Sequence, residues 1–341
     1  MRKKKVGLWV LGVCLALIAA LVLPAVQSGK LTLPVPKKER FELSASDAEY
    51  LPRLRLDGKT LVNDAGETVI LQGIMVPVPR KLRMEGKFTR EYFEEVFALG
   101  VNALRIPVHP DAWEQDEYYL WRYLDPAVEW AVQSGVYVIL DLHCIGNIRT
   151  GDGEQMPSGN AEEYAVSFWR AVSSYFRDVP NVLFEIYNEP TLIDSNTWAQ
   201  YATLLVDTIR ETGCEQVIIV SGTDYAYDLR AWREHPLEDE NILYSAHIFP
   251  NRHGTAELSK NAEDLPVIVT EWGYIAQDEP AAQRYLIGAR ETYAVPMLTV
   301  MREKKIGWIA CWYDDGWEPP MLRKDGEGWT DWGEFVLDAL E

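Results

Sequence analysis

The sequence predicts an α/β fold: a (β/α)8 TIM barrel with an N-terminal transmembrane helix. Short runs of almost entirely apolar residues alternate with helical patterns, which is typical of a parallel sheet buried on both faces. Eight such runs occur, and eight strand–helix units close a barrel. An uncharged apolar run behind a basic cluster, at residues 6–26, predicts the membrane helix.

The N-terminus reads as a membrane anchor. Four basic residues at positions 2–5 precede the apolar run, which places the N-terminus in the cytoplasm and the rest of the chain outside. A cleaved signal peptide is the alternative, but its apolar region is shorter, about 7–15 residues. The predicted organisation is therefore a basic cap and signal anchor over 1–28, a polar linker over 29–47 and a catalytic domain over 48–341. We expect a single-pass membrane protein, or a secreted one if the segment is cleaved.

The composition limits the classes of partner. The 341 residues carry a net charge of −19, which argues against nucleic acid, since phosphate binding needs a basic face. Such an acidic chain favours solubility and neutral substrates. The four cysteines do not form a disulfide framework, and we interpret Cys144 and Cys311 as small buried residues at strand ends.

The elements follow in order. A hairpin with an Asp57-Gly58 turn spans Leu54–Val62. The eight predicted strands are Thr68–Ile74, Val101–Pro107, Val136–His143, Val182–Asn188, Gln216–Ser221, Ile242–His247, Pro266–Thr270 and Ile306–Trp312. The predicted helices are Thr89–Leu99, Leu124–Ser134, Ala161–Phe176, Ser195–Thr212, Ala281–Lys304 and Trp332–Leu340. A doubly wound sheet would need a glycine-rich first turn, and Gly73-Ile74-Met75 is not one.

Two of the strand-like runs end in a glutamate. These are Glu189, in Asn188-Glu189-Pro190, and Glu271, in Thr270-Glu271-Trp272-Gly273. Burying an unpaired carboxylate costs several kcal/mol, so a carboxylate in this position indicates chemistry rather than packing. Two carboxylates at strand ends are the pattern of a glycosidase acid–nucleophile pair.

Other polar residues fall at or near the ends of the remaining strands, where barrel enzymes carry their active sites. Singly, each could be a buried structural residue, but their number makes that reading improbable. They are Arg105, His143, Asn188, His247 and Trp312.

This set resembles glycoside hydrolase family 5, from about Leu54 to the C-terminus. The resemblance implies Glu189 as general acid/base and Glu271 as nucleophile of a retaining mechanism, with no cofactor. It also implies Arg105, His143, Asn188, His247 and Trp312 around the sugar being cleaved. The expected function is an endo-β-glycosidase acting on a polysaccharide or oligosaccharide, with β-1,4-glucan first and β-mannan second.

One position departs from the family pattern. Phe249 stands where a tyrosine usually reaches the nucleophile, and we expect Tyr274 or Tyr313 to supply a hydroxyl instead. Four aromatic residues are candidates for outer sugar-binding positions: Trp113, Tyr187, Trp272 and Trp317.

Two other functions remain as alternatives. A metal-dependent barrel hydrolase could use the two histidines and two glutamates as ligands, but no close ligand pair lies on one strand. A non-catalytic, membrane-tethered glycan-binding barrel is the other, against which the intact carboxylate pair argues.

Overall fold

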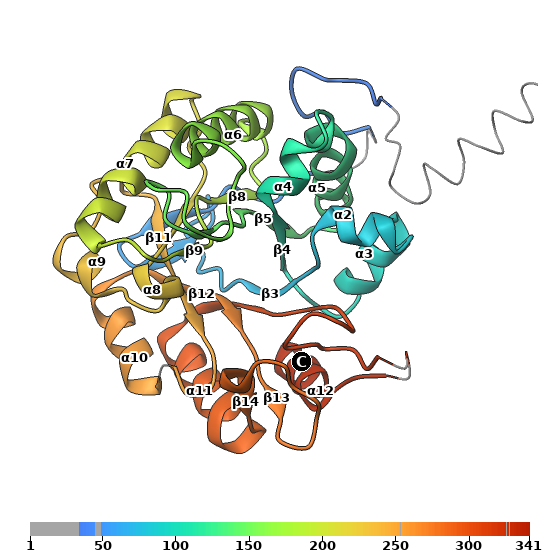
Figure 1. Ribbon diagram of the computed structural model, residues 1–341, viewed down its shortest axis with the longest axis vertical. Coiled ribbons are helices and arrows are strands. Elements are labelled where there is room, and N and C mark those ends of the chain that lie inside the picture. Colours follow the sequence, from blue (N-terminus) through green and yellow to red (C-terminus); the bar gives the residue numbers. More distant parts are fainter. Residues whose placement is uncertain (1–33, 45–48, 253, 325, 327) are drawn as a thin grey trace, which may run out of the picture.

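The predicted barrel is confirmed. The computed structural model describes residues 34–44, 49–252, 254–324, 326 and 328–341, and in them eight parallel strands close a barrel ringed by helices (Figure 1). In barrel order the strands are β3 (Gln72–Met75), β4 (Ala103–Val108), β5 (Tyr137–Leu142), β8 (Val182–Glu185), β10 (Ile218–Ser221), β11 (Ile242–Ile248), β12 (Val267–Trp272) and β15 (Gly307–Ala310).

The strands are apolar along their length because both faces are covered. Every residue of β4, β5, β11 and β12 is buried, so no alternation of polar and apolar positions is possible. The register slips by one residue between Ala246 and His247 of β11, and again between Val269 and Trp272 of β12. Such irregularities redirect side chains, and here they lie at His247 and Glu271.

Long helices pack on the outside of the strands. The predicted helices near 89–99, 124–134, 161–176, 195–212 and 332–340 are confirmed within two residues at each end. They are α3 (Arg90–Phe97), α5 (Asp125–Gln133), α6 (Ala161–Phe176), α7 (Ser195–Glu211) and α12 (Asp331–Leu340). Asn160 and Asp194 cap α6 and α7 by accepting hydrogen bonds from backbone N–H groups three residues on.

The sequence reading missed several short elements. These are α2 (Pro79–Met84), α4 (Pro110–Glu114), the π-helical turn η1 (Leu120–Leu124), α8 (Thr223–Ala226), α9 (Arg230–Glu234) and α10 (Thr255–Asp264). Most are too short to show a helical repeat, and tertiary packing decides whether they form.

The predicted helix over Ala281–Lys304 is wrong in its first part. A 3-10 turn, η2 (Arg284–Leu286), and a short strand, β14 (Ile287–Gly288), come first. The helical part begins with a π-helical turn, η3 (Arg290–Ala294), and continues as α11 (Val295–Lys304). Pro296 lies in the first turn of α11, where a missing N–H removes no intrahelical bond. Ile287 and Gly288 pair with β13 (Ile275–Ala276), the short strand after β12, instead of extending the helix.

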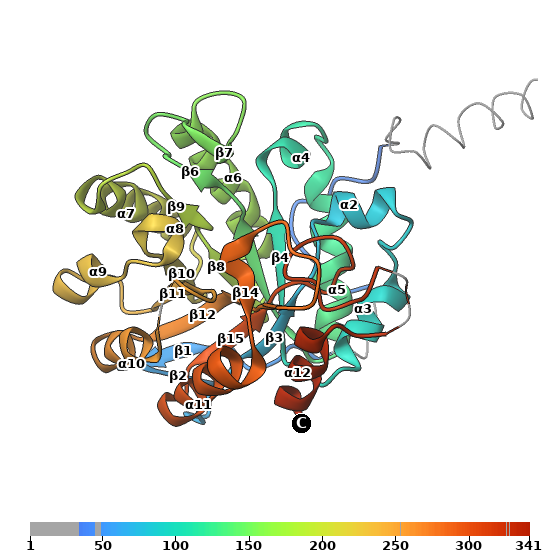
Figure 2. The same ribbon diagram turned by 60° about the horizontal axis from the view of Figure 1, so that its bottom comes forward.

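Small sheets lie at opposite ends of the barrel (Figure 2). The predicted hairpin, β1 (Arg55–Asp57) with β2 (Thr60–Val62), covers the end where the strands begin, and Leu56 N–H donates to Asn241 just before β11. At the other end β6 (Ile145–Gly146), β7 (Gly153–Gln155) and β9 (Glu189–Pro190) form one sheet, and β13 (Ile275–Ala276) pairs with β14. The β6–β7–β9 sheet and the β13–β14 pair therefore lie at the end where the barrel strands finish.

The segment before the barrel lies partly on its surface. In Pro34–Ser44, Phe41 is buried, its N–H donates to Tyr175 of α6, and Lys38 pairs with Asp125 of α5. The predicted membrane segment at residues 6–26 lies outside the described residues. Within the described part of the chain, no helix has the length and apolar character needed to cross a membrane.

Candidate active site

Arg105 is the centre of a buried polar network at the end of the barrel where the strands finish. It lies in the middle of β4, not at the strand end as predicted, and is fully buried. Its Nη1 donates to Glu271 Oε1 at 2.7 Å, and its Nη2 donates to Asn188 Oδ1 at 2.7 Å. These bonds orient both acceptor side chains through a group that stays charged.

Two further carboxylates in this network were missed by the sequence reading. Glu185 accepts from Arg105 Nε at 2.6 Å, and Asp141 lies 3.0 Å from Nη2. Both are fully buried, Glu185 as the last residue of β8 and Asp141 as the second-last residue of β5. The signal in the sequence was the charge of each residue within an apolar run. Such a buried charge needs a partner of opposite sign, which here is Arg105.

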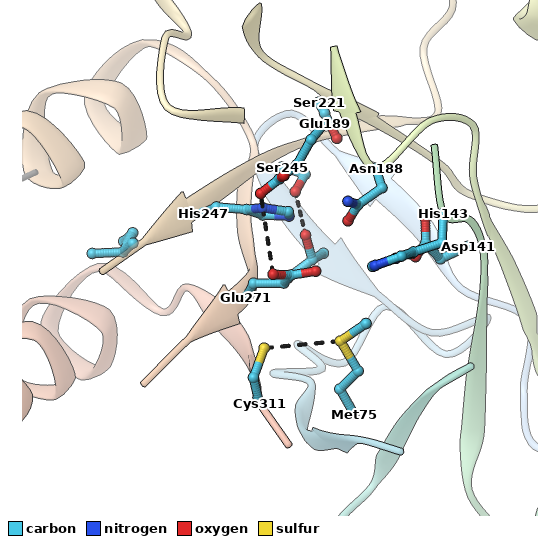
Figure 3. A network of polar contacts seen from close by, with 12 residues as sticks. Met75, Asp141, His143, Asn188, Glu189, Ser221, Ser245, His247, Glu271 and Cys311 are labelled. Atoms are coloured by element: carbon cyan, nitrogen blue, oxygen red, sulfur yellow. Dashed lines mark hydrogen bonds and ion pairs between the residues drawn. The ribbon is translucent and has the colours of Figure 1, made fainter. Parts of the chain in front are cut away.

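The two predicted glutamates lie side by side, linked by His247. Its Nδ1 is 2.8 Å from Glu189 Oε1 and 3.7 Å from Glu271 Oε2. One carboxylate oxygen from each glutamate and one ring nitrogen of His247 all lie within 4.8 Å of one another. Figure 3 shows the three side chains converging from separate strands. The structure thus brings the carboxylates into the range where they can act on one bond.

The backbone fixes the position of Glu189. Strand β8 ends at Glu185, yet the chain stays extended, with Asn188 N–H donating to Leu142 and Glu189 N–H donating to Cys144. Glu189 then enters β9, which pairs with β6. The acidic side chain is held by main-chain hydrogen bonds rather than by a free loop.

The two carboxyls differ in their electrostatic surroundings. Burial raises the pKa of Glu189 to about 8, with Asp141 and Glu154 adding to the effect and Arg105 opposing it. Burial also raises the pKa of Glu271, but His247 and a direct hydrogen bond from Arg105 oppose that rise. Glu189 is therefore the carboxyl suited to carry a proton at neutral pH, and Glu271 is suited to be ionised.

Neutral polar groups face the same space. Burial lowers the pKa of His143 well below its usual value, and its Nδ1 is 2.6 Å from Asp141. A neutral His143 that donates to Asp141 presents Nε2 as an acceptor. Among the described residues, Asn188 Nδ2 and His247 Nε2 are buried atoms without a hydrogen-bond partner. Both atoms therefore have unused hydrogen-bonding capacity.

An aromatic wall lies on the β4 and β15 side. Trp312, the second residue after β15, meets Trp317 edge-on with ring centroids 4.8 Å apart. Trp317 in turn stacks on His109, which directly follows β4, at 5.6 Å. The sugar-binding role predicted for Trp312 stays a prediction, and His109 is a neighbour that the sequence analysis did not name.

The predicted outer aromatics divide into two groups. Trp317 belongs to the wall, whereas Trp113, Tyr187 and Trp272 pack into the core. Tyr274 and Tyr313 were expected to replace the hydroxyl absent from Phe249. However, the Tyr274 hydroxyl donates to Asp331 of α12, and the Tyr313 ring packs on Tyr92. Neither hydroxyl has a contact with Glu271.

The arrangement also has the donors for a metal ion. Glu189, His247 and Glu271 each offer one ligand atom within 4.8 Å of the others. Two features disfavour a metal there. Arg105 already binds Glu271, and its positive charge is buried beside the site. The raised pKa of Glu189 also works against a ligand that must be deprotonated.

The family comparison covers most of the barrel. A family model described as cellulase (glycosyl hydrolase family 5) matches residues 62–315. Endoglucanase A from Butyrivibrio fibrisolvens is 27% identical over 253 residues, which are 67% of this chain and 54% of that protein. Endoglucanase N from Pectobacterium atrosepticum is 26% identical over 322 residues, 87% of this chain and 67% of that protein. The chain spans about half of the first relative's length.

Solved structures share the fold. The native form of a beta-glucanase from Saccharophagus degradans has a TM-score of 0.82 at 25% identity, covering 90% of this chain and 97% of that one. The same beta-glucanase has been solved in complex with cellotetraose. The catalytic domain of Thermobifida fusca endoglucanase Cel5A has a TM-score of 0.71 at 21% identity, covering 84% and 97%.

Proposed function

The chain belongs to glycosyl hydrolase family 5, and on that premise we propose that it is a retaining endo-β-glycosidase with Glu189 as acid/base and Glu271 as nucleophile. The observation that carries the proposal is the separation of the two carboxylates. Oxygens of Glu189 and Glu271 lie within 4.8 Å of each other. Retaining enzymes hold their carboxyls about 5–5.5 Å apart, whereas inverting enzymes need about 6.5–9.5 Å to admit a water molecule.

In the first step, ionised Glu271 attacks the anomeric carbon and the glycosidic C–O bond breaks. Glu189 gives its proton to the departing oxygen, so the leaving sugar departs as an alcohol. The raised pKa of Glu189 supports this role, because the acid must hold its proton at neutral pH. Arg105 orients Glu271 for the attack through its 2.7 Å hydrogen bond.

In the second step, water replaces the leaving sugar. Glycosylated Glu271 has lost its charge, so Glu189 no longer faces that anion and its pKa falls. Glu189 then takes a proton from the water as the oxygen attacks the anomeric carbon, and the Glu271 ester bond breaks. This returns both carboxyls to their starting states.

The remaining residues are proposed to bind the sugar whose bond breaks. Asn188, held by Arg105 through its oxygen, has a free Nδ2 for the 2-hydroxyl. His143 and His247 each offer a ring nitrogen to other hydroxyls, and Trp312 offers a flat apolar face. Hydrogen bonds to the 2-hydroxyl strengthen in the transition state, so we expect Asn188 to affect kcat.

We propose β-1,4-glucan as the substrate, with β-mannan second. The curated relatives are endoglucanases, and one structural neighbour is a glucanase bound to cellotetraose. A Thermomonospora fusca β-mannanase with bound mannohexaose has a TM-score of only 0.64 at 17% identity, which shows the fold alone. The relatives' names thus favour glucan.

The test is reducing-sugar release by the full chain from soluble β-1,4-glucan, β-1,3-glucan, mannan and xylan. Glu189→Gln and Glu271→Gln should each abolish release while leaving the fold intact. Unchanged release in the presence of EDTA is expected, and its loss would favour the metal-dependent alternative. Binding of glucan by a folded wild-type chain without release would favour the non-catalytic alternative.

The proposed location is outside the cytoplasmic membrane, tethered by residues 6–26. The basic residues 2–5 before this apolar run support that orientation. Fractionation should recover the protein with membranes, and protease added to spheroplasts should digest the barrel. A barrel released into the medium would instead indicate cleavage of the N-terminal segment.

A further inference from the structure

Three side chains that the proposed mechanism leaves unused gather at one side of the site. The guanidinium carbon of Arg252 lies 5.1 Å from the ring centroid of Tyr227 and 5.7 Å from that of Tyr285. The Tyr285 ring also meets Phe249 nearly edge-on, with centroids 6.0 Å apart. The cation is thus held against two aromatic rings, an arrangement that leaves its in-plane N–H donors available.

This cluster borders the reacting carboxyls. Burial raises the pKa of Tyr285, and the charges of Glu189 and Glu271 both add to that rise. Burial and the same two carboxylates also raise the pKa of Tyr227. The positive charge of Arg252 opposes the rise at Glu189. The geometry agrees, because Tyr227 lines a small cavity together with His247, which contacts both Glu189 and Glu271.

The barrel order places Tyr227, which follows β10, and Arg252, which follows β11, across the barrel from His109 of the aromatic wall. Arg252 follows β11, and β11 lies four strands from β4 in either direction around the closed barrel. His109, which stacks on Trp317, directly follows β4. A glycan chain that crosses the two carboxylates would thus contact the wall on one side and the cluster on the other.

The backbone around Tyr227 is strained. The three residues before it, Asp224, Tyr225 and Ala226, have φ of 54°, 60° and 60°. Non-glycine residues rarely occupy this left-handed region, and such strain concentrates at functional sites. Backbone hydrogen bonds in both directions between Thr223 and Asp228 close the turn. Tyr227 is therefore presented by a rigid turn at the end of β10.

Tyr285 is held by the segment that was wrongly predicted as helix. Its neighbour Leu286 is buried, Ile287 pairs with the strand after β12, and Asn251 Nδ2 donates to the Ile287 carbonyl at 3.3 Å. Gln283 N–H donates to Glu318 at 3.0 Å. Tyr285 remains 37% exposed, so its ring is held in place but is accessible to a ligand.

We propose that Tyr227, Arg252 and Tyr285 form the subsite for the sugar on the leaving-group side of the scissile bond. This inference rests on the proposed function. His143 and Trp312 are in contact with each other at the opposite side and are assigned to the sugar that becomes bound to Glu271. The exposed Tyr285 ring stacks against a neutral pyranose, and Arg252 donates hydrogen bonds to its hydroxyls. The ligand class is therefore the reducing-end part of a β-linked glucan.

The test compares two substrates that differ in the leaving group. Cellopentaose places sugars on both sides of the bond, whereas β-cellobiosyl fluoride places none on the leaving side. The variants are Tyr285→Ala and Arg252→Gln, in the full chain. The control is Tyr50→Ala, since Tyr50 is 39% exposed and its neighbour Leu51 binds Asn181 before β8, at the opposite end of the barrel.

For each variant we expect kcat/KM on cellopentaose to fall about tenfold or more, since a lost stacking or charged hydrogen-bond contact has about that effect. Fluoride release from β-cellobiosyl fluoride should stay within about twofold of wild type, and Tyr50→Ala should change neither rate. Equal losses on both substrates, or no loss on either, would overturn the inference. A wild-type chain that cleaves neither substrate would refute the proposed function itself and the inference with it.

Discussion

Replacing Glu189 with glutamine should stabilise the folded protein, and the gain should grow as the pH rises. Burial raises the pKa of Glu189 to about 8 from an ordinary value of 4.5. A carboxyl whose pKa is higher in the folded state binds its proton more tightly there than in the unfolded chain. Its favourable contribution to folding is complete below pH 4.5 and is lost as the pH rises through 8. The glutamine amide is uncharged at every pH and escapes this loss.

The size follows from the same two values. Each pKa unit corresponds to about 1.4 kcal/mol, so a shift from 4.5 to about 8 gives an upper limit of roughly 4–5 kcal/mol at pH 9. Solvent relaxation and the loss of the contact with His247 reduce this figure, so we expect a difference of about 2–4 kcal/mol between pH 5 and pH 9.

The assay is guanidinium-induced unfolding of the wild type and of Glu189→Gln at pH 5, 7 and 9. Asp141, whose pKa burial raises to about 7, contributes to the pH dependence of both proteins, so the difference between them reports Glu189 together with its interaction with Asp141. A difference in unfolding free energy that is the same at all three pH values would refute the reasoning. It would mean that the Glu189 carboxyl has an ordinary pKa.

Three further outcomes are expected. On the alkaline side, kcat/KM should fall with an apparent pKa near 8, because Glu189 must be protonated to donate its proton. If the same alkaline fall persists in Glu189→Gln with β-cellobiosyl fluoride, another group causes it. Arg105→Met should lower the unfolding free energy by about 3–5 kcal/mol, because Asp141, Glu185 and Glu271 lose their shared buried partner. An unchanged denaturation midpoint would contradict this. Phe41→Ala should lower the unfolding free energy by about 3–5 kcal/mol, because it removes the packing of this ring against Phe176 of α6. An unaltered thermal unfolding midpoint would show that the segment before the barrel does not add to its stability.

The local sequence was informative where burial imposes a pattern. Strand β12 is apolar on both faces, so its one charged residue, Glu271, was visible as an exception. Glu189 and Asn188 were found in the same way. Because active-site residues of a barrel lie at the face where its strands finish, these residues were predicted to lie close together.

The same reasoning failed where the pattern was weak. Asp141 and Glu185 were passed over because only the fold shows that Arg105 lies between them. Trp272 looked like a sugar-binding ring, but it packs against Trp308 and Trp332 in the core. Whether an aromatic side chain faces core or ligand depends on contacts made by distant elements.

Local periodicity was enough to predict the barrel and to identify the polar residues at its strand ends, because burial of apolar residues follows that periodicity. Tertiary structure alone decided which of those residues touch, and that the carboxylates of Glu189 and Glu271 share one histidine. It also decided the course of residues 281–289, which pair with a strand and carry Tyr285 beside Arg252. Such contacts join segments far apart in the chain, and the local sequence does not encode which distant partner a loop will meet.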